Sequence, residues 1–280
     1  MAHTVGIVGT GLIGASLALA LKRRDPAPHV AGFDTDAARA VRALELGALD
    51  ACADSPSQLG ADITVLAAPV GAMRGALAAL SPPDGAIITD VGSVKAAVMR
   101  DARDALGGAS ACFVPGHPVA GAENSGPEAA SATLFDNCRV VLTPGAAADR
   151  DAVAAVAAMW RAAGAAEVVE MDAAAHDRVF ACASHLPHAV AYALMDGLLA
   201  RADADAVFDC AAGGLRDFTR VAASDPVMWR DIFLANADGV VEALDDFSAA
   251  AGRLRDLIAR GDGDALQKLL EEVAARRRDG

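Results

Sequence analysis

Residues 4–14 read TVGIVGTGLIG, and this stretch decides the fold. An apolar, β-branched run leads into a G-x-G-x-x-G loop, and an apolar helical stretch, Ile13–Arg24, follows. In such a loop the first glycine allows a tight turn, the second lets the backbone approach a pyrophosphate, and the third lets the helix pack close to the strand. The N–H groups of the helix start favour phosphates. We therefore predict a dinucleotide site formed by Gly9, Gly11, Leu12, Ile13 and Gly14.

A carboxylate follows this motif at the spacing that ribose binding requires. Asp34 lies 20 residues after Gly14 and directly after the predicted strand His29–Phe33. Its oxygens can accept hydrogen bonds from the ribose hydroxyls of NAD and would repel the additional phosphate of NADP. Arg39 complicates this interpretation, because a nearby arginine can accommodate that phosphate. We predict NAD as the cofactor.

Short β-branched runs alternate with alanine-rich helical stretches through the first half of the chain, a pattern typical of a doubly wound parallel sheet. A later pair of strands flanks one more helix. The predicted strands are Thr4–Val8, His29–Phe33, Ile63–Ala67, Ala86–Thr89, Ala111–Val114, Arg139–Leu142 and Glu167–Glu170. The predicted helices between them are Ile13–Arg24, Asp36–Leu46, Val94–Leu106 and Asp149–Ala163.

Strand signals end near residue 170, and the remainder has the pattern of helices separated by short breaks. We therefore predict an α/β protein with a Rossmann-type domain over 1–170 and an all-helical domain over 171–280. The helical part is apolar and low in aromatic residues, so we expect it to bury one face against a second copy in a homodimer. Little chain remains for a further regulatory domain.

Composition narrows the classes of function and location. The formal net charge is -13 with no visible basic patch, which argues against a nucleic-acid partner. The five cysteines are odd in number and form no C-x-x-C pair, which argues against a disulfide framework or a zinc knuckle and favours the cytoplasm. Residues 4–21 carry no charge, but glycines interrupt them and no basic residue precedes them, so we predict a buried strand and helix rather than a membrane segment.

Two polar segments follow predicted strands of the first domain. Residues 89–95 (TDVGSVK) contain Ser93, and residues 116–123 (GHPVAGAE) contain His117. Ligands of open α/β sheets bind beyond the carboxyl ends of the strands, so both side chains can reach a substrate beside a nicotinamide. Ser93 could also cap its helix, and His117 taken alone could be structural. We expect Lys95 at the surface or behind the site.

Two further polar segments lie in the helical part. Ser184 and His188 are four residues apart and share a helix face, while Pro187 removes a backbone donor and bends the helix. We interpret His185 as structural and expect no zinc, because no acid accompanies the H-x-x-H spacing. Residues 216–220 (RDFTR) supply two fixed cations in an acidic chain, suited to carboxylates. Ser224-Asp225-Pro226 then opens a helix that carries Trp229.

Taken together, these segments resemble one enzyme family. The order G-x-G-x-x-G, D-x-G-S-V-K, G-H-P-x-A-G-x-E, S-H-L-P-H and R-D-F-T-R-x-A-x-S-D-P-x-M-W is similar to that of the prephenate/arogenate dehydrogenases of tyrosine biosynthesis, over nearly the whole chain. The resemblance implies a Rossmann domain, a helical dimerisation domain and NAD(P)-dependent oxidative decarboxylation.

The resemblance also implies roles for individual residues. His117 would hydrogen-bond the ring hydroxyl of the substrate and accept its proton, which a neutral imidazole can do near neutral pH. Ser93 would steady that hydroxyl and His117. Arg220 would bind a substrate carboxylate. The pocket would be lined by Ser184, His188 and Trp229.

Two alternatives stay open. A β-hydroxyacid dehydrogenase of the same superfamily would need a lysine in the helical domain, where Lys268 is the only one after residue 170 and lies in a solvated pattern. A non-catalytic NAD-sensing module would not need both His117 and Arg220. The sequence does not distinguish prephenate from arogenate, which differ by a keto and an amino group.

Overall fold

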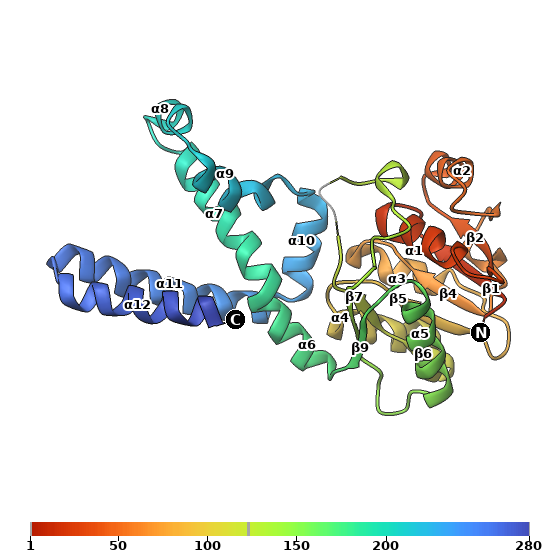
Figure 1. Cartoon of the computed structure of the whole chain (residues 1–280). Helices are drawn as coiled ribbons and strands as arrows, with labels where there is room; N and C mark the ends of the chain where they lie inside the picture. Colours follow the sequence, from red (N-terminus) through yellow and green to blue (C-terminus); the bar gives the residue numbers. More distant parts are fainter. Residues whose placement is uncertain (1, 122–123, 280) are drawn as a thin grey trace. The chain divides into compact units, whose positions relative to one another are not determined.

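The computed structural model describes residues 2–121 and 124–279 (Figure 1). Ala122 and Glu123, which end the motif at 116–123, lie outside the described residues. The chain forms two compact units. Unit 1 comprises residues 1–180 and 224–236, and unit 2 comprises residues 181–223 and 237–280.

A six-stranded parallel sheet lies at the centre of unit 1. Its strand order, β3-β2-β1-β4-β5-β6, is the order of dinucleotide-binding folds, so the predicted fold class is confirmed. The sequence analysis missed the two-residue strand β3, which is too short to show a hydrophobic pattern. The strands are β1 (Thr4–Val8), β2 (His29–Phe33), β3 (Ala51–Cys52), β4 (Ile63–Leu66), β5 (Ile87–Asp90) and β6 (Phe113–Val114).

Helices cover both faces of this sheet, because successive side chains of a strand point to opposite sides. In β4, Val65 packs in the core cluster that includes Leu17 of α1 and Val156 of α5. Its neighbour Leu66 packs in the other cluster, with Leu77 of α3 and Val98 of α4. The helices concerned are α1 (Leu12–Lys22), α3 (Met73–Ala78), α4 (Ala96–Leu106) and α5 (Arg150–Ala162).

A second sheet of three strands adds one strand that the sequence analysis did not predict. Gly116–Pro118 form β7, antiparallel to β8 (Arg139–Leu142), and β8 runs parallel to β9 (Glu167–Glu170). Pro118 is tolerated because β7 is an edge strand. His117 therefore lies on a strand with a fixed register, opposite Val141, and not on a loop.

Three more helices complete unit 1, namely α2 (Ala37–Glu45), α6 (Ala173–Phe180) and α10 (Pro226–Ala235). Asp36 caps α2, and Asp225 caps α10 through the N–H groups of Val227 and Met228. Helix α4 begins at Ala96, two residues later than predicted, because a carboxylate from α6 accepts the N–H groups of Lys95 and Ala96.

Unit 2 is helical throughout its described residues, 181–223 and 237–279. It opens with a π-helix, Ala181–His185, which ends two residues before Pro187, where the sequence analysis expected a bend. The helices α11 and α12 pack along one another (Figure 1). The remaining helices are α7 (Leu186–Leu199), α8 (Ala204–Asp209), α9 (Gly213–Thr219), the 3-10 turn η6 (Arg220–Ala223), α11 (Ala237–Arg260) and α12 (Gly263–Asp279).

The sequence placed a functional boundary after residue 170, and β9 does end at Glu170. The helices α6 and α10 lie after residue 170 but pack with the sheet, and so they belong to unit 1. The division into a cofactor-binding part before residue 171 and a substrate-binding part after it stays a prediction. No helix among the described residues is long and apolar enough to span a membrane.

Candidate active site

The glycine loop between β1 and α1 has the shape that a dinucleotide needs. Gly9 has a φ of +96°, and a Cβ there would lie 2.5 Å from the carbonyl oxygen of Ala67. A Cβ at Gly14 would collide with the carbonyl oxygen of Gly9. At Gly11, the N-cap of α1, a Cβ would meet nothing within 4 Å, and the first turn of α1 carries no acidic residue. These residues fit the pyrophosphate of a dinucleotide.

Asp34 lies at the carboxyl end of β2, where the sequence analysis expected it, and is half-buried. Its Oδ2 accepts hydrogen bonds from the backbone N–H of Thr10 at 2.8 Å and from the Thr10 hydroxyl at 3.2 Å. Asp34 therefore joins β2 to the glycine loop and still has acceptor capacity for ribose hydroxyls. Arg39 lies in α2, exposed, 3.5 Å from Asp36.

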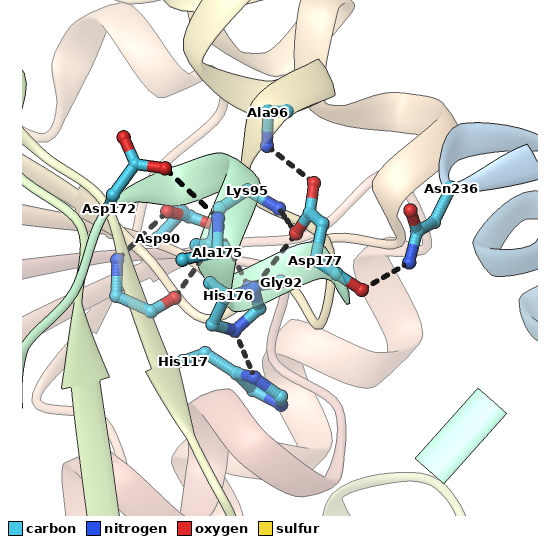
Figure 2. Close-up of polar contacts among 11 residues, drawn as sticks. Asp90, Gly92, Lys95, Ala96, His117, Asp172, Ala175, His176, Asp177 and Asn236 are labelled. Atoms are coloured by element: carbon cyan, nitrogen blue, oxygen red, sulfur yellow. Dashed lines mark hydrogen bonds and ion pairs between the residues drawn. The ribbon is translucent and has the colours of Figure 1, made fainter. Parts of the chain in front are cut away.

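His117 lies close to the same edge of the parallel sheet as the glycine loop. The chain leaves β6 at its carboxyl end and enters β7 two residues later, and in a parallel sheet that edge also carries the loop after β1. The His117 side chain is 8% exposed, and its ring centroid lies 4.5 Å from that of Phe180. Its Nδ1 lies 2.9 Å from Nε2 of His176 (Figure 2).

His176 connects His117 to a carboxylate. Nδ1 of His176 lies 2.8 Å from Oδ1 of Asp177, and His176 is fully buried against Phe180, with ring centroids 4.4 Å apart. Since an ionised carboxylate only accepts hydrogen bonds, Nδ1 of His176 carries the proton of that bond. The three side chains His117, His176 and Asp177 form a hydrogen-bonded chain, which Figure 2 shows.

Asp177 also holds the start of α4. It accepts the N–H of Lys95 on Oδ1 at 2.8 Å and that of Ala96 on Oδ2 at 2.9 Å, and its own carbonyl accepts from the side chain of Asn236 at 2.8 Å. Burial alone would raise the pKa of Asp177, but the hydrogen bonds from His176, Lys95 and Ala96 outweigh it and hold the pKa below its usual value.

A buried ion pair fixes the residue before His117. Nζ of Lys95 pairs with Oδ2 of Asp90, and both side chains are fully buried. The same ammonium donates to the Gly116 carbonyl at 2.6 Å, while Oδ1 of Asp90 accepts the Gly116 N–H at 3.1 Å. We call this arrangement the Gly116 clamp. Of the two places expected for Lys95, the surface and a position behind the site, the structure excludes the surface. Burial lowers the pKa of Lys95, and the charge of Asp90 opposes that shift.

Ser93 lies between β5 and α4, half-buried, three residues after Asp90. The alternative role for Ser93, as a helix cap, is not observed, because the N-cap position is Lys95 and no side chain of that residue caps α4. The clamp brings the segments of Ser93 and His117 together, because Asp90 and Lys95 flank Ser93 in sequence and both bind the residue before His117.

Trp229 of α10 also belongs to unit 1 and is 6% exposed. Its ring centroid lies 5.3 Å from that of Phe233. Helix α10 packs on the 3-10 turn η2 (Val70–Ala72), which follows β4. Trp229 is therefore carried by a helix at the carboxyl-end edge of the parallel sheet.

Unit 2 brings together three other predicted residues. Ser184 lies in the π-helix, and its carbonyl lies 2.9 Å from Nδ1 of His188. Since a carbonyl only accepts, Nδ1 of His188 is the donor. The pKa of His188 is lowered first by burial and further by the charge of Arg220, while the Ser184 carbonyl opposes the shift. Arg220 begins η6 and is exposed, as is Arg216. His185 is fully buried, in keeping with a structural role.

Sequence reasoning missed His176, Asp177 and Asp90. A signal existed for two of them. In α6 the positions Ala173, His176, Asp177 and Phe180 share one helix face, and His176, Asp177 and Phe180 are all buried. A histidine and an aspartate on an apolar helix face need polar partners there. For Asp90 the signal was weaker, because it is the one charged residue of its strand and stands at the strand's end.

Across the described ranges 2–121 and 124–279, we find no group of three His, Cys, Asp or Glu side chains arranged to hold a metal ion.

Family models match both parts of the chain. The model described as prephenate dehydrogenase, nucleotide-binding domain, matches residues 17–169. The model described as prephenate dehydrogenase, dimerization domain, matches residues 172–272.

Individual relatives agree with these models. A cyclohexadienyl dehydrogenase of Zymomonas mobilis is 39% identical over 96% of this chain and 92% of its own length. A prephenate dehydrogenase of Bacillus subtilis is 37% identical over 100% of this chain and 76% of its own length. The crystal structure of prephenate dehydrogenase from Aquifex aeolicus in complex with hydroxyphenyl propionate and NAD+ superposes with a TM-score of 0.91 at 36% identity, covering 99% of this chain and 98% of that one.

Proposed function

The chain belongs to the prephenate dehydrogenase family, and we propose that it catalyses the NAD-dependent oxidative decarboxylation of prephenate, arogenate or both. The products are 4-hydroxyphenylpyruvate from prephenate and tyrosine from arogenate. The predicted family and enzyme class are thus confirmed, whereas the roles of single residues are proposals.

One observation carries the proposal more than any other: a nearly buried histidine on a strand, hydrogen-bonded through Nδ1, close to the sheet edge where the glycine loop lies. His117 acts as the general base for the ring hydroxyl, and Ser93 hydrogen-bonds that hydroxyl and orients it. NAD, when bound, accepts the hydride from the carbinol carbon. The ring carboxylate leaves as carbon dioxide, and its bonding electrons complete the aromatic ring. The ring oxygen then takes a proton back, which gives the phenol of the product and returns His117 to its neutral form.

Cofactor binding falls to the glycine loop and Asp34. The contacts with the pyrophosphate come from the backbone at Gly9, Gly11, Leu12, Ile13 and Gly14. The Asp34 carboxylate accepts the ribose hydroxyls and repels the additional phosphate of NADP. Thr10 helps indirectly, because its two hydrogen bonds hold the Asp34 carboxylate against the loop.

Substrate binding depends on short-range contacts, because the chain carries a net charge of -13 and the substrate carries two carboxylates. Arg220 binds one carboxylate, with a planar fork that can make two parallel hydrogen bonds. Ser184 and His188, which lie with Arg220 in unit 2, contribute to substrate binding there. Trp229 of α10 in unit 1 stays a further proposed substrate-binding residue.

The larger organisation is also part of the proposal. Residues 1–170 bind the cofactor, and residues 171–280 bind the substrate and form a homodimer. Exposed apolar side chains on α11 and α12, such as Phe247, Ile258 and Val273, support the dimer. A cytoplasmic location fits the five free cysteines.

The alternatives are not favoured. A β-hydroxyacid dehydrogenase would need a catalytic lysine from the helical domain, and Lys268, the only lysine after residue 170, lies exposed on α12. A non-catalytic NAD sensor would have no use for a buried histidine tied to a carboxylate.

The test is turnover with each substrate, followed at the absorbance of NADH, with NAD and with NADP. We expect NADH formation with prephenate, arogenate or both, and a lower kcat/KM with NADP. A purified, NAD-binding protein that turns over neither substrate would contradict the proposal. Comparing kcat/KM for the two substrates decides which is preferred.

A further inference from the structure

We propose that His176 and Asp177 are positioning residues for the reaction: they lock His117 in the tautomer that presents Nε2 as the base and balance the charge of the imidazolium that forms. The inference rests on the proposed function, because it assigns a role to groups behind its general base. His176 and Asp177 lie next to one another in α6, fully buried and nearly so, and neither side chain needs to touch substrate.

The tautomers follow from donors and acceptors. Asp177 can only accept, so Nδ1 of His176 donates to it across 2.8 Å. In neutral His176 the other ring nitrogen, Nε2, is then an acceptor. The 2.9 Å contact with His117 therefore requires that His117 donates from Nδ1. Neutral His117 with its proton on Nδ1 has its lone pair on Nε2, which is the nitrogen that must take the hydroxyl proton.

The hydrogen-bonded chain from Asp177 through His176 also stabilises the imidazolium that forms when His117 accepts the proton. When Nε2 of His117 takes the proton, the imidazolium keeps its Nδ1–H bond to His176, and no proton has to move between the two rings. The hydrogen bond strengthens, because its donor is now charged and its acceptor is polarised by Asp177. The arrangement parallels a Ser-His-Asp triad, in which the carboxylate fixes the tautomer and stabilises the imidazolium without becoming protonated.

Asp177 fixes more than one part of the site. Its oxygens also accept the N–H groups of Lys95 and Ala96 (Figure 2). The same carboxylate therefore holds both the start of α4 and the hydrogen-bonded pair of histidines, His117 and His176. The charged and titratable groups around His176 are His117 on β7, Asp177 on α6, and the Lys95–Asp90 pair before α4. That pair is neutral as a whole, which leaves Asp177 as the one net negative charge among these groups.

The first experiment determines the tautomers of His117 and His176 without measuring catalysis. Nitrogen-15 NMR of histidine-labelled protein, above the pH range in which histidines titrate, should show Nδ1 protonated and Nε2 unprotonated in both His117 and His176. In Asp177→Asn the side-chain amide can donate to Nδ1 of His176, which should then carry its proton on Nε2 and force His117 into the opposite tautomer. An Nε2-protonated His117 in the unmodified protein would overturn the proposal.

The second experiment reads chemistry in a single turnover. Asp177→Asn should lower the rate of NADH formation by about 10²-fold or more, as loss of the base tautomer does in related triads. The acidic limb of the pH–rate profile should move to lower pH by about half a unit to one unit, because a negative charge near the imidazolium is lost. The KM for NAD should change little.

Two variants separate this role from a structural one. His176→Phe keeps a ring against Phe180 and leaves Asp177 its bonds to α4, yet should lose a similar factor in rate. Asp149→Asn removes the charge of another helix N-cap, that of α5, and should leave rate and pH profile unchanged. The proposed positioning role would be refuted by a His176→Phe variant that forms NADH at the full rate. It would also be refuted by an Asp177→Asn variant whose pH–rate profile keeps its acidic limb in place. A protein inactive on both substrates would refute the proposed function instead, and the NMR result would still decide the positioning role.

Discussion

The candidate site residues of unit 1 and unit 2 differ in how far they are buried. Around His117, the side chains of Asp90, Lys95 and His176 are fully buried. Asp90 and Lys95 bind one another and the main chain of Gly116, while His176 bonds to His117 and Asp177. In unit 2, Arg220 is exposed, while Ser184 and His188 are half-buried. For the roles proposed above, the difference predicts a division of labour: the groups that move a proton are buried and held by hydrogen bonds, while the arginine that binds a carboxylate lies at the surface.

This contrast has consequences for mutation. A buried polar group that loses its partner costs free energy that water cannot restore, whereas an exposed arginine can re-form hydrogen bonds with solvent. We therefore expect changes in unit 1 to affect kcat and stability, and changes in unit 2 to affect KM.

The largest expected effect comes from the base. His117→Asn should lower kcat by about 10²–10⁴-fold, the usual contribution of general base catalysis, and should leave the affinity for NAD unchanged. Steady-state kinetics and a direct titration with NAD test both parts. A variant that retains nearly full kcat would remove His117 from the mechanism.

Next in size is the Gly116 clamp. Lys95→Met leaves the carboxylate of Asp90 buried without its cation and should lower the free energy of unfolding by about 3–5 kcal/mol. The matched control is Lys22→Met, which breaks a more exposed pair with Asp50 and should cost about 0–1 kcal/mol.

The double variant Asp90→Asn, Lys95→Met sharpens this test. It removes both charges and should recover much of the stability lost in Lys95→Met, while activity stays low because His117 is no longer held through Gly116. Denaturant unfolding of the three variants measures the order. If Lys95→Met and Lys22→Met lowered the free energy of unfolding equally, the buried pair would contribute no more to stability than the exposed one.

In unit 2 the expected effect is on substrate affinity. Arg220→Lys loses a two-pronged contact with a carboxylate, and the loss of a charge-assisted hydrogen bond, about 1.5–3 kcal/mol, corresponds to a KM roughly 10- to 150-fold higher. The value of kcat should change less. Arg216→Lys is the control and should do little. The reverse pattern would mean that Arg216 binds the carboxylate, and if neither responded, Arg230 would be the next candidate.

A smaller effect is expected on cofactor choice. Asp34→Ser should narrow the preference for NAD over NADP, because a hydroxyl no longer repels the additional phosphate. The KM for NAD should also rise, because Asp34 holds Thr10 of the loop. Asp149→Ser keeps a capping oxygen at the start of α5 and should leave the preference unchanged. Equal kcat/KM for both cofactors in the unmodified protein would contradict the role of Asp34.

The smallest expected effect is on how the free energy of unfolding depends on pH, which should differ between a histidine of unit 2 and an aspartate of unit 1. His188 has a lowered pKa, so the unfolded chain binds its proton more tightly and folding loses stability as pH falls below the ordinary value of 6.5. Asp177 also has a lowered pKa, but its stabilising contribution is lost only as pH falls below 3.8. His188→Gln should therefore flatten the pH dependence of unfolding between about pH 7 and 5, and Asp177→Asn should not. Unchanged slopes in His188→Gln would contradict the assignment.

The parallel sheet and the glycine loop could be predicted because their signals are local. The strand β1, the glycine loop and α1 follow one another in the chain. The strands β2 and β4, which pair with β1, are each a short, mostly apolar run that can be recognised in the sequence. The strand β7 could not be predicted in the same way, because its three residues are defined by antiparallel pairing with β8, more than 20 residues later.

The site shows the same limit. The sequence analysis selected His117 and Ser93 by position after a strand, and the structure puts both at that edge of unit 1. The partners that hold them were missed, because Asp177 meets Lys95 only after α6 has packed on α4, and a lysine in sequence gives no sign that Asp90 will enclose it.

The Gly116 clamp has a consequence for the electrostatics of the reaction. The charges of Lys95 and Asp90 sum to zero, so the pair holds the main chain in place without adding a net charge next to His117. With both histidines neutral, the buried cluster carries the single negative charge of Asp177. Once His117 has accepted a proton, the cluster is electrically neutral as a whole. A protein interior tolerates a neutral assembly better than a charged one, so in the proposed mechanism the surroundings of His117 stabilise its imidazolium.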